Sequence, residues 1–289
     1  FSTFYARRIK RIFPASFVCL CCVCVASLWF PPSVQIRVIK AAAASAIHGA
    51  NFFFAFGLKG GYLGDDAAEN PLLNYWSLSV EEQFYMAWPL LLFAIHHRKS
   101  NGFTVALIGA ALSFALSQVL LYSKQSAVAY FMLPARGGEL LLGAAVAWAE
   151  AHKIGTDRLT PLFRNVLSLV CVGGIFWSAF FLSSAVSYPG FAAMVPCVAT
   201  AGLIYLGCGE QRSAAVVALW VLGLPPFVAV GLASFSAYLY HWPVLVYARL
   251  SAVDLTVPSN MFLVLGFVAM VTYVSYNVVE QPLRKVTWP

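Results

Sequence analysis

Apolar segments long enough to cross a lipid bilayer recur along this chain of 289 residues. A membrane-spanning helix needs about 20 predominantly apolar residues, whereas a strand of a transmembrane barrel would alternate in polarity over about 10 residues. The uninterrupted runs therefore predict an all-α fold, a polytopic transmembrane helical bundle with about nine spans. The expected spans are Ile12–Phe30, Val38–Leu58, Trp76–Ile95, Phe103–Tyr122, Tyr130–Trp148, Arg164–Leu182, Gly190–Cys208, Ala229–Leu250 and Asn260–Val279.

The composition supports a membrane protein. Hydrophobic residues make up 61% of the chain and charged residues only 10%, against about 45–50% and about 25% in a typical soluble domain. One globular core cannot bury this excess, because the surface of a soluble fold must still face water.

The formal net charge of +7 indicates contact with anionic membrane lipids and cytoplasmic basic loops. The tightest basic cluster, at residues 7–11, precedes the first expected span. No basic face of a folded domain is visible, so we expect no nucleic-acid partner. Three expected spans separate this cluster from the next basic stretch at Arg98. Three crossings would place the two basic stretches on opposite sides of the membrane, although basic loops favour the cytoplasmic side. Either one of the three segments is therefore re-entrant, or one basic loop lies outside the cytoplasm.

The sequence predicts no metal site. Cys21 and Cys24 form a C-x-x-C pattern inside an apolar segment, where packing as small hydrophobic side chains is the expected role. His96 and His97 are neighbours and do not face one ligand on a helix. The acidic, glycine-containing loop 59–74 lacks the spacing of an EF-hand.

Two adjacent carboxylates, Glu81 and Glu82, stand at the start of an apolar run. A charge near the bilayer centre costs roughly 2.5–3.5 kcal/mol on insertion scales, so each needs a compensating role. Glu82 fits a capping box with Ser79. Glu81 instead lies on a polar helical stripe, which typically faces a bundle interior or a wet cavity and suits general acid or base chemistry. The other members of the stripe are Ser77, Tyr85 and Trp88.

Arg136 and Glu139 are three residues apart and can pair along one helical face. One interpretation is a pair that neutralises itself. The alternative is an arginine aimed at an anion or at Glu81, with Glu139 holding its rotamer.

Ser234, Tyr238 and His241 fall on one helical face in the eighth expected span. The following Pro243 removes a backbone hydrogen bond and frees the carbonyl of Leu239. A histidine on such a face is either a satisfied core residue or part of a site. At the end of the last span, Glu280 is a helix-end carboxylate, for which solvation is the ordinary expectation.

Five segments in this order resemble motifs of the acyltransferase-3 family of polytopic membrane O-acyltransferases, and the resemblance covers essentially the whole chain. The matching segments are Phe4–Ala15 (F-Y-x-R-R-x-x-R-I-x-P-A), Trp76–Tyr85 (W-S-L-x-V-E-E-Q-F-Y), Arg136–Gly143 (R-x-x-E-L-L-L-G), Ser236–Pro243 (S-x-Y-L-x-H-x-P) and Val279–Arg284 (V-E-Q-P-L-R).

The resemblance implies one acyltransferase-3 transmembrane domain over residues 1–289, in a multi-pass protein of a bacterial inner membrane. It implies transfer of an acyl group, usually acetyl, from acetyl-CoA to a hydroxyl of a cell-surface or lipid-linked glycan. Coenzyme A is a cytoplasmic polyanion, so Arg7, Arg8 and Arg11 are the expected phosphate ligands.

The candidate site residues follow from these motifs and from the polar stripes. The expected catalytic residues, lining a polar cavity, are Glu81, Arg136, Glu139 and His241. The expected supporting residues are Trp76, Ser77, Glu82, Gln83, Tyr85, Tyr238 and Glu280.

Members of this family normally begin with two further helices, the first of which carries the histidine taken as the catalytic base. This chain begins at Phe1, so the resemblance implies a domain that is incomplete at its N-terminus. Glu81 is then expected to support a base that lies outside the chain. Two alternatives stay open: a transporter or flippase of glycans or lipids, in which polar groups inside a bundle are equally expected, and a truncated, inactive acyltransferase.

Overall fold

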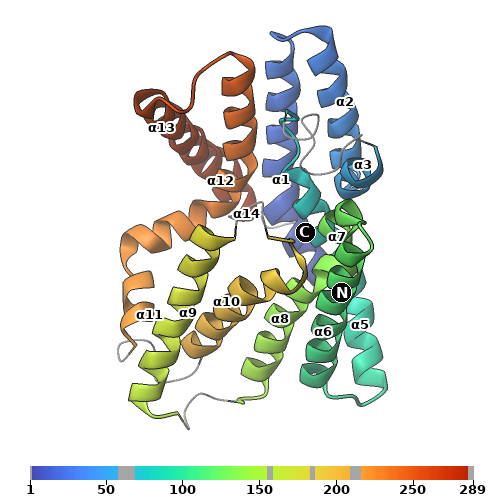
Figure 1. Cartoon of the computed structure of the whole chain (residues 1–289), viewed down its shortest axis with the longest axis vertical. Helices are drawn as coiled ribbons and strands as arrows, with labels where there is room; N and C mark the ends of the chain where they lie inside the picture. The colour runs from blue at the N-terminus through green and yellow to red at the C-terminus, as the bar shows by residue number, and fades with distance from the viewer. Residues whose placement is uncertain (1, 58–68, 155–158, 183–185, 209–215, 286–289) are drawn as a thin grey trace. The chain divides into compact units, whose positions relative to one another are not determined.

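The computed structural model describes residues 2–57, 69–154, 159–182, 186–208 and 216–285 (Figure 1). Every regular element in these ranges is a helix, and no strand occurs among them. The prediction of an all-α fold is therefore confirmed. The chain divides into two compact units, unit 1 with residues 1–79 and 229–289, and unit 2 with residues 80–228.

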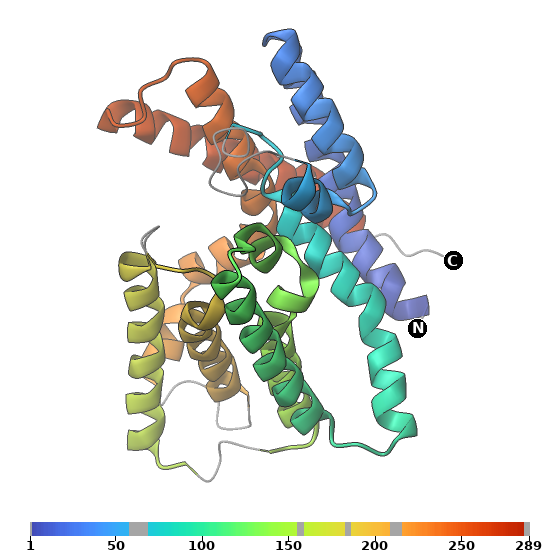
Figure 2. The same ribbon diagram turned by 45° about the vertical axis from the view of Figure 1, so that its right-hand side comes forward.

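Unit 1 is built from the two ends of the chain. Helix α1 packs against α2, and the last helical segments also pack against α1; α1 and α2 lie side by side in both views (Figures 1 and 2). The helices of unit 1 are α1 (Ser2–Ser27), α2 (Pro32–Ala46), α3 (Ala50–Phe56), most of α12 (Pro225–Leu250), α13 (Pro258–Val274), the π-helix η3 (Ser275–Glu280) and α14 (Gln281–Lys285).

Unit 2 is a bundle in which α6 packs along α8, and α9 packs along α10 (Figure 2). Ala110, Phe114 and Ala193 form a buried cluster where α6 meets the segment before α10. The helices of unit 2 are most of α5 (Tyr75–His97), α6 (Gly102–Tyr122), α7 (Ser126–Phe131), α8 (Leu133–Ala151), α9 (Pro161–Phe181), the 3₁₀ helix η2 (Gly190–Ala193), α10 (Met194–Gly207) and α11 (Val217–Leu222).

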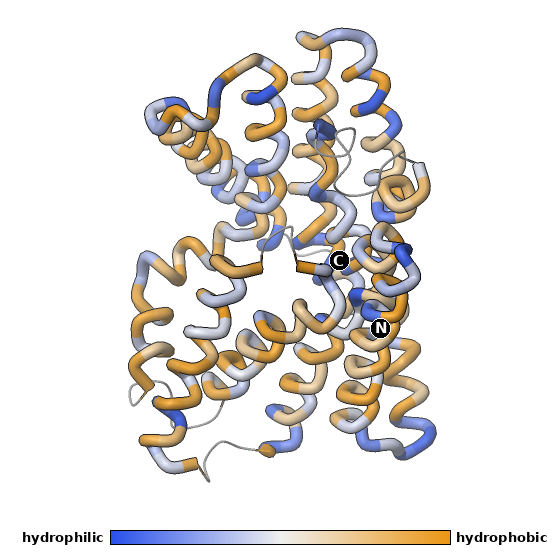
Figure 3. The backbone as a smooth tube through the Cα atoms, viewed as in Figure 1, coloured by the Kyte–Doolittle hydropathy of each residue, from blue (hydrophilic) through white to orange (hydrophobic). Residues whose placement is uncertain are grey.

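Six helical segments in the described residues are long and apolar enough to cross a membrane, and Figure 3 shows hydrophobic residues along them. The chain is therefore an integral membrane protein, although the predicted count of about nine spans is not confirmed. The polar residues in the first turns of α5 and α8 lower the hydropathy of those helices. The six segments are Thr3–Ser27, Gly102–Tyr122, Pro161–Phe181, Gly190–Gly207, Pro225–Leu250 and Pro258–Lys285.

Two expected spans are interrupted. The segment predicted as Val38–Leu58 ends as a helix at Ala46 and restarts at Ala50. The segment predicted as Tyr130–Trp148 breaks at Met132, which is extended (φ −91°, ψ 137°). Pro134 favours a new helix start there, since proline suits the first turn of a helix. Apolar composition alone did not reveal either break.

The first break is a Schellman motif at the end of α2. The backbone N–H of His48 donates to Ser45 O (3.0 Å), and that of Gly49 donates to Ala44 O (2.8 Å). His48 therefore adopts a left-handed conformation, with a φ of 53°. In the described part of the chain, every non-glycine residue with positive φ follows a helix in this way: His48, Lys99, Lys124, Lys153 and Ala252.

Substitution of Ala252 by glycine is expected to stabilise the protein. Ala252 is exposed and has a φ of 58°, a conformation in which the Cβ atom is unfavourable and glycine has no penalty. We expect the free energy of unfolding in detergent micelles to rise by about 0.5–1 kcal/mol. The matched control is Ala111→Gly at an exposed position inside α6, which should lower stability by about 1 kcal/mol. Equal losses in the two variants would contradict this account of the turn.

Candidate functional site

The start of α8 is held against α6 by a close backbone approach. Ser113 Oγ donates to the carbonyl oxygen of Pro134 (2.7 Å) and accepts from the backbone N–H of Gly138 (2.8 Å). A Cβ atom on Gly138 would lie 2.9 Å from the carbonyl oxygen of Ala110, so this approach requires glycine. The contacts fix the turn of α8 that carries the predicted ion pair.

The predicted pairing of Arg136 with Glu139 is confirmed. Arg136 Nη1 lies 2.8 Å from Glu139 Oε1, and their side chains are 11% and 25% exposed. The guanidinium also lies over the rings of Tyr130 (5.4 Å) and Tyr188 (5.5 Å), a cation–π arrangement that stabilises the charge. The sequence did not single out either tyrosine, because nothing in the local pattern links them to α8.

Asn74 and Tyr238 join the start of α5 to the middle of α12 by two reciprocal hydrogen bonds. Asn74 Nδ2 donates to the carbonyl oxygen of Tyr238, and Tyr238 Oη donates to the carbonyl oxygen of Asn74, each at 2.8 Å. Ser77 Oγ also contacts Tyr238 Oη. Two predicted supporting residues, Ser77 and Tyr238, are therefore in contact, and Asn74 is an addition that the sequence analysis missed.

His241 is oriented by its own helix. Its Nδ1 lies 2.8 Å from the carbonyl oxygen of Tyr238 and 3.3 Å from that of Ala237. A carbonyl oxygen only accepts hydrogen bonds, so the network assigns the proton of the neutral ring to Nδ1 and the lone pair to Nε2. Ser234, expected on the same stripe, bonds Gly231 O instead (2.8 Å).

The carbonyl oxygen of Leu239, which Pro243 leaves without a helical donor, is contacted by two side chains. Leu239 O accepts from Asn74 Nδ2 at 3.4 Å and lies 3.5 Å from Cys19 Sγ. Because the proline ring carries no N–H, these side chains take over the missing helical donor. The expectation that Pro243 frees the Leu239 carbonyl in α12 is confirmed, and the structure identifies its partners, Asn74 and Cys19.

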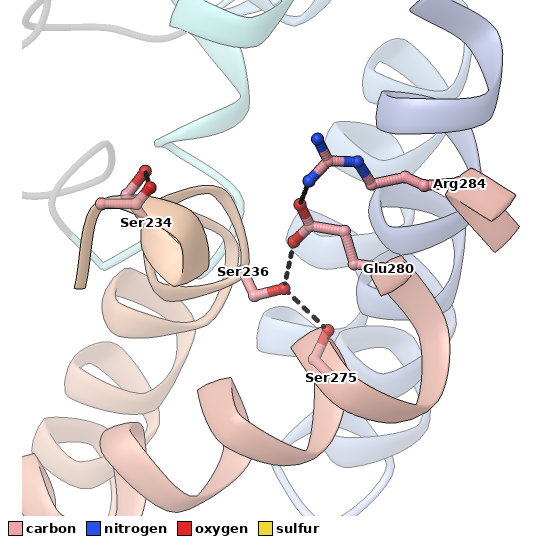
Figure 4. A network of polar contacts seen from close by, with 6 residues as sticks. Ser234, Ser236, Ser275, Glu280 and Arg284 are labelled. Atoms are coloured by element: carbon pink, nitrogen blue, oxygen red, sulfur yellow. Dashed lines mark hydrogen bonds and ion pairs between the residues drawn. The ribbon is translucent and has the colours of Figure 1, made fainter. Parts of the chain in front are cut away.

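Glu280 is not solvated, contrary to expectation. It is 2% exposed, and Figure 4 shows its carboxylate between Ser236 of α12 and Arg284 of α14. Ser236 Oγ donates to it at 2.8 Å, and Arg284 Nη1 lies 3.4 Å away. Ser275 Oγ lies 3.3 Å from Ser236 Oγ. A π-helical turn places Glu280 facing inward, and such turns are frequent at functional sites.

The capping box predicted for Ser79 and Glu82 is wrong. Helix α5 begins at Tyr75, so Ser79 lies inside it, where its Oγ donates to Tyr75 O (3.0 Å) and accepts from the backbone N–H of Ala50 (3.2 Å). Among the remaining predicted residues of α5, Trp76 is buried. The half-buried ones are Glu81, Glu82, Gln83 and Tyr85.

The predicted donor-binding arginines lie on the first turns of α1. Arg7 and Arg11 are exposed and four residues apart, and therefore share a face. Arg8 is half-buried, with its guanidinium 5.6 Å from the ring centre of Phe4. Arg7 and Arg11 are thus accessible to an anion.

The candidate catalytic residues are distributed over both units. Glu81, Arg136 and Glu139 belong to unit 2, whereas His241 belongs to unit 1. The expectation that these four side chains line one polar cavity stays a prediction.

Unit 1 contains a cavity of about 970 Å³ between α1, α12 and α13. Its lining is mostly aliphatic and aromatic and includes Trp29, Tyr240, Tyr247 and Phe267. Among the described residues, none of the predicted site residues lines it. The cavity therefore lacks the charged groups expected of a transfer site.

Burial lowers the pKa of His48, which lies in the turn between α2 and α3. In the described ranges, no three His, Cys, Asp or Glu side chains are grouped so as to hold a metal ion. The predicted absence of a metal stays a prediction.

Comparison with known proteins identifies relatives over nearly the whole chain. An O-acetyltransferase of Staphylococcus aureus is 25% identical over 98% of this chain and 47% of its own length. A peptidoglycan O-acetyltransferase of Listeria monocytogenes is 26% identical over 98% of this chain and 46% of its own length. A putative peptidoglycan O-acetyltransferase of Bacillus subtilis is also 26% identical. The chain spans about half the length of these curated relatives.

No solved structure matches the chain. The family comparison is decisive, because the acyltransferase domain model of the acyltransferase-3 family matches residues 1–276. Four of the five motif segments found in the sequence lie inside this match, and the fifth, Val279–Arg284, lies beyond it. This chain belongs to the acyltransferase-3 family of membrane acyltransferases.

Proposed function

We propose that this chain is the acyltransferase domain, over residues 1–289, of a membrane O-acyltransferase that transfers an acetyl group from acetyl-CoA to a hydroxyl of a cell-envelope or lipid-linked glycan. The observation that carries the proposal is the match of the acyltransferase domain over residues 1–276. The names of the relatives, O-acetyltransferase and peptidoglycan O-acetyltransferase, support acetyl as the group and a glycan as the acceptor. We place the protein in a bacterial inner membrane.

The transfer reaction sets the chemical demands on the site. The acceptor oxygen attacks the thioester carbonyl carbon, the C–S bond breaks, coenzyme A leaves as the thiolate, and the hydroxyl proton passes to a base. A fixed guanidinium stabilises negative charge that develops on the carbonyl oxygen. We assign this role to Arg136, since Glu139 and two aromatic rings hold it in place.

The remaining assignments follow from burial and contact. Glu81 is assigned as the carboxylate that supports the base, and His241 as a polar group lining the transfer path, with Nε2 as a hydrogen-bond acceptor. Tyr238 and Glu280 position α12 through their hydrogen bonds. The supporting positions on α5 are Trp76, Ser77, Glu82, Gln83 and Tyr85.

Transfer by the full-length protein in proteoliposomes tests the proposal. We expect [14C]acetyl-CoA to label soluble peptidoglycan fragments through an alkali-labile ester. Movement of the fragments across the membrane without acetyl-CoA and without labelling would instead identify a transporter. Absence of both activities in folded protein would identify an inactive acyltransferase.

Substitution of both Arg7 and Arg11 by glutamine is expected to raise the KM for acetyl-CoA about tenfold, with kcat little changed. Both arginines are exposed, and loss of charge-assisted contacts to phosphate weakens ground-state and transition-state binding alike. Initial rates over a range of acetyl-CoA concentrations measure the effect. The matched control is Arg98→Gln in another exposed basic stretch, and an equal rise in its KM would contradict a specific donor site.

A further inference from the structure

Asn74 occupies an unusual position for an amide side chain. It is the residue immediately before α5, and it is 6% exposed. Its Nδ2 donates to two successive carbonyl oxygens of α12, those of Tyr238 (2.8 Å) and Leu239 (3.4 Å). Because both neighbours of Nδ2 are acceptors, the orientation of the amide follows from the network.

The carbonyl of Tyr238 is shared with His241. His241 Nδ1 lies 2.8 Å from this oxygen, so the amide and the imidazole donate to one acceptor. In the same turn, the carbonyl oxygen of Leu239 lacks the backbone N–H donor that a residue other than proline would supply at position 243. Asn74 therefore binds α12 in the turn that lacks one backbone hydrogen bond and that orients His241.

The segment around Asn74 is fixed in return. Tyr238 Oη donates to the carbonyl oxygen of Asn74 (2.8 Å), and Trp242 Nε1 donates to that of Asn70 (2.8 Å). Among the described residues, Asn74 Oδ1 has no hydrogen-bond partner, so the hydrogen bonds of the amide are made through Nδ2. The hydrogen bonds from Asn74 to α12 require an N–H donor, which the side chains of leucine and aspartate do not have.

We propose that Asn74 is a positioning residue for His241: by fixing the Tyr238 carbonyl, it holds the imidazole in the Nδ1–H tautomer and keeps Nε2 available as an acceptor for the reacting groups. This inference rests on the proposed function for the role of Nε2, but not for the tautomer itself. Asn74 acts through the backbone and is not a catalytic residue.

The test combines NMR with kinetics on the full-length protein in nanodiscs. The chain has five histidines, so 15N-histidine labelling with His241→Gln for assignment resolves the His241 ring. Wild type should show the Nδ1–H tautomer. Asn74→Leu and Asn74→Asp should show a mixture of both tautomers, and acetyl transfer from [14C]acetyl-CoA to peptidoglycan fragments should lose about tenfold in kcat with an unchanged KM.

The matched control is Trp242→Phe. It removes the hydrogen bond from Trp242 Nε1 to the carbonyl oxygen of Asn70, which joins the same segments, but leaves the Tyr238 carbonyl untouched. It should retain the wild-type tautomer and rate. An unchanged tautomer in both Asn74 variants overturns the inference, as does an equal loss of kcat in the Trp242 variant. If wild type transfers no acetyl group, the proposed function fails, while the NMR comparison still decides the role of Asn74.

Discussion

Replacement of Arg136 by alanine is expected to abolish detectable acetyl transfer and to lower the free energy of unfolding by about 2–3 kcal/mol. Removing one partner of a fully buried ion pair costs about 3–5 kcal/mol. The expected loss is smaller here because Glu139 is 25% exposed. Denaturation in mixed detergent micelles and the [14C]acetyl-CoA assay measure the two effects.

Two further variants separate folding from chemistry. Arg136→Lys keeps the charge but loses the planar fork and the stacking on Tyr130 and Tyr188, so it should fold better than the alanine variant and still lose activity. The double variant Arg136→Met, Glu139→Leu removes both charges and should recover most of the stability without activity. Transfer by the double variant at the wild-type rate would show that the pair is purely structural.

Replacement of Glu280 by leucine is expected to destabilise unit 1 by about 2 kcal/mol, because the buried hydroxyl of Ser236 loses its acceptor and Arg284 loses its partner. Thermal unfolding in micelles measures the loss. Glu280→Gln keeps an acceptor for Ser236 and should lose less than half as much.

Ser234→Ala serves as the control for this second prediction. Ser234 lies on the same helix as Ser236, but it is exposed and bonds only within its own turn (Figure 4). Its replacement should change stability by less than about 0.5 kcal/mol. A loss in this variant equal to that of Glu280→Leu would argue against a specific role for the Glu280 network.

Local patterns predicted those features that depend on neighbours in the same helix. Spacing alone placed Arg136 beside Glu139, and proline chemistry alone predicted a freed carbonyl at Leu239. The predictions failed where backbone geometry interrupts an apolar run, as at His48 within the expected span Val38–Leu58. A hydropathy pattern does not report φ, so the Schellman turn after Ala46 was invisible in it.

By itself, the sequence determined that this protein is an all-helical membrane chain of the acyltransferase-3 family, because apolar run lengths and ordered motifs are local properties. The tertiary structure decided which distant groups meet. Asn74 and Tyr238 are 164 residues apart, and Ser236 and Glu280 are 44 apart. Each of these contacts depends on how separate helices pack, and helical periodicity carries no information about a partner on another helix.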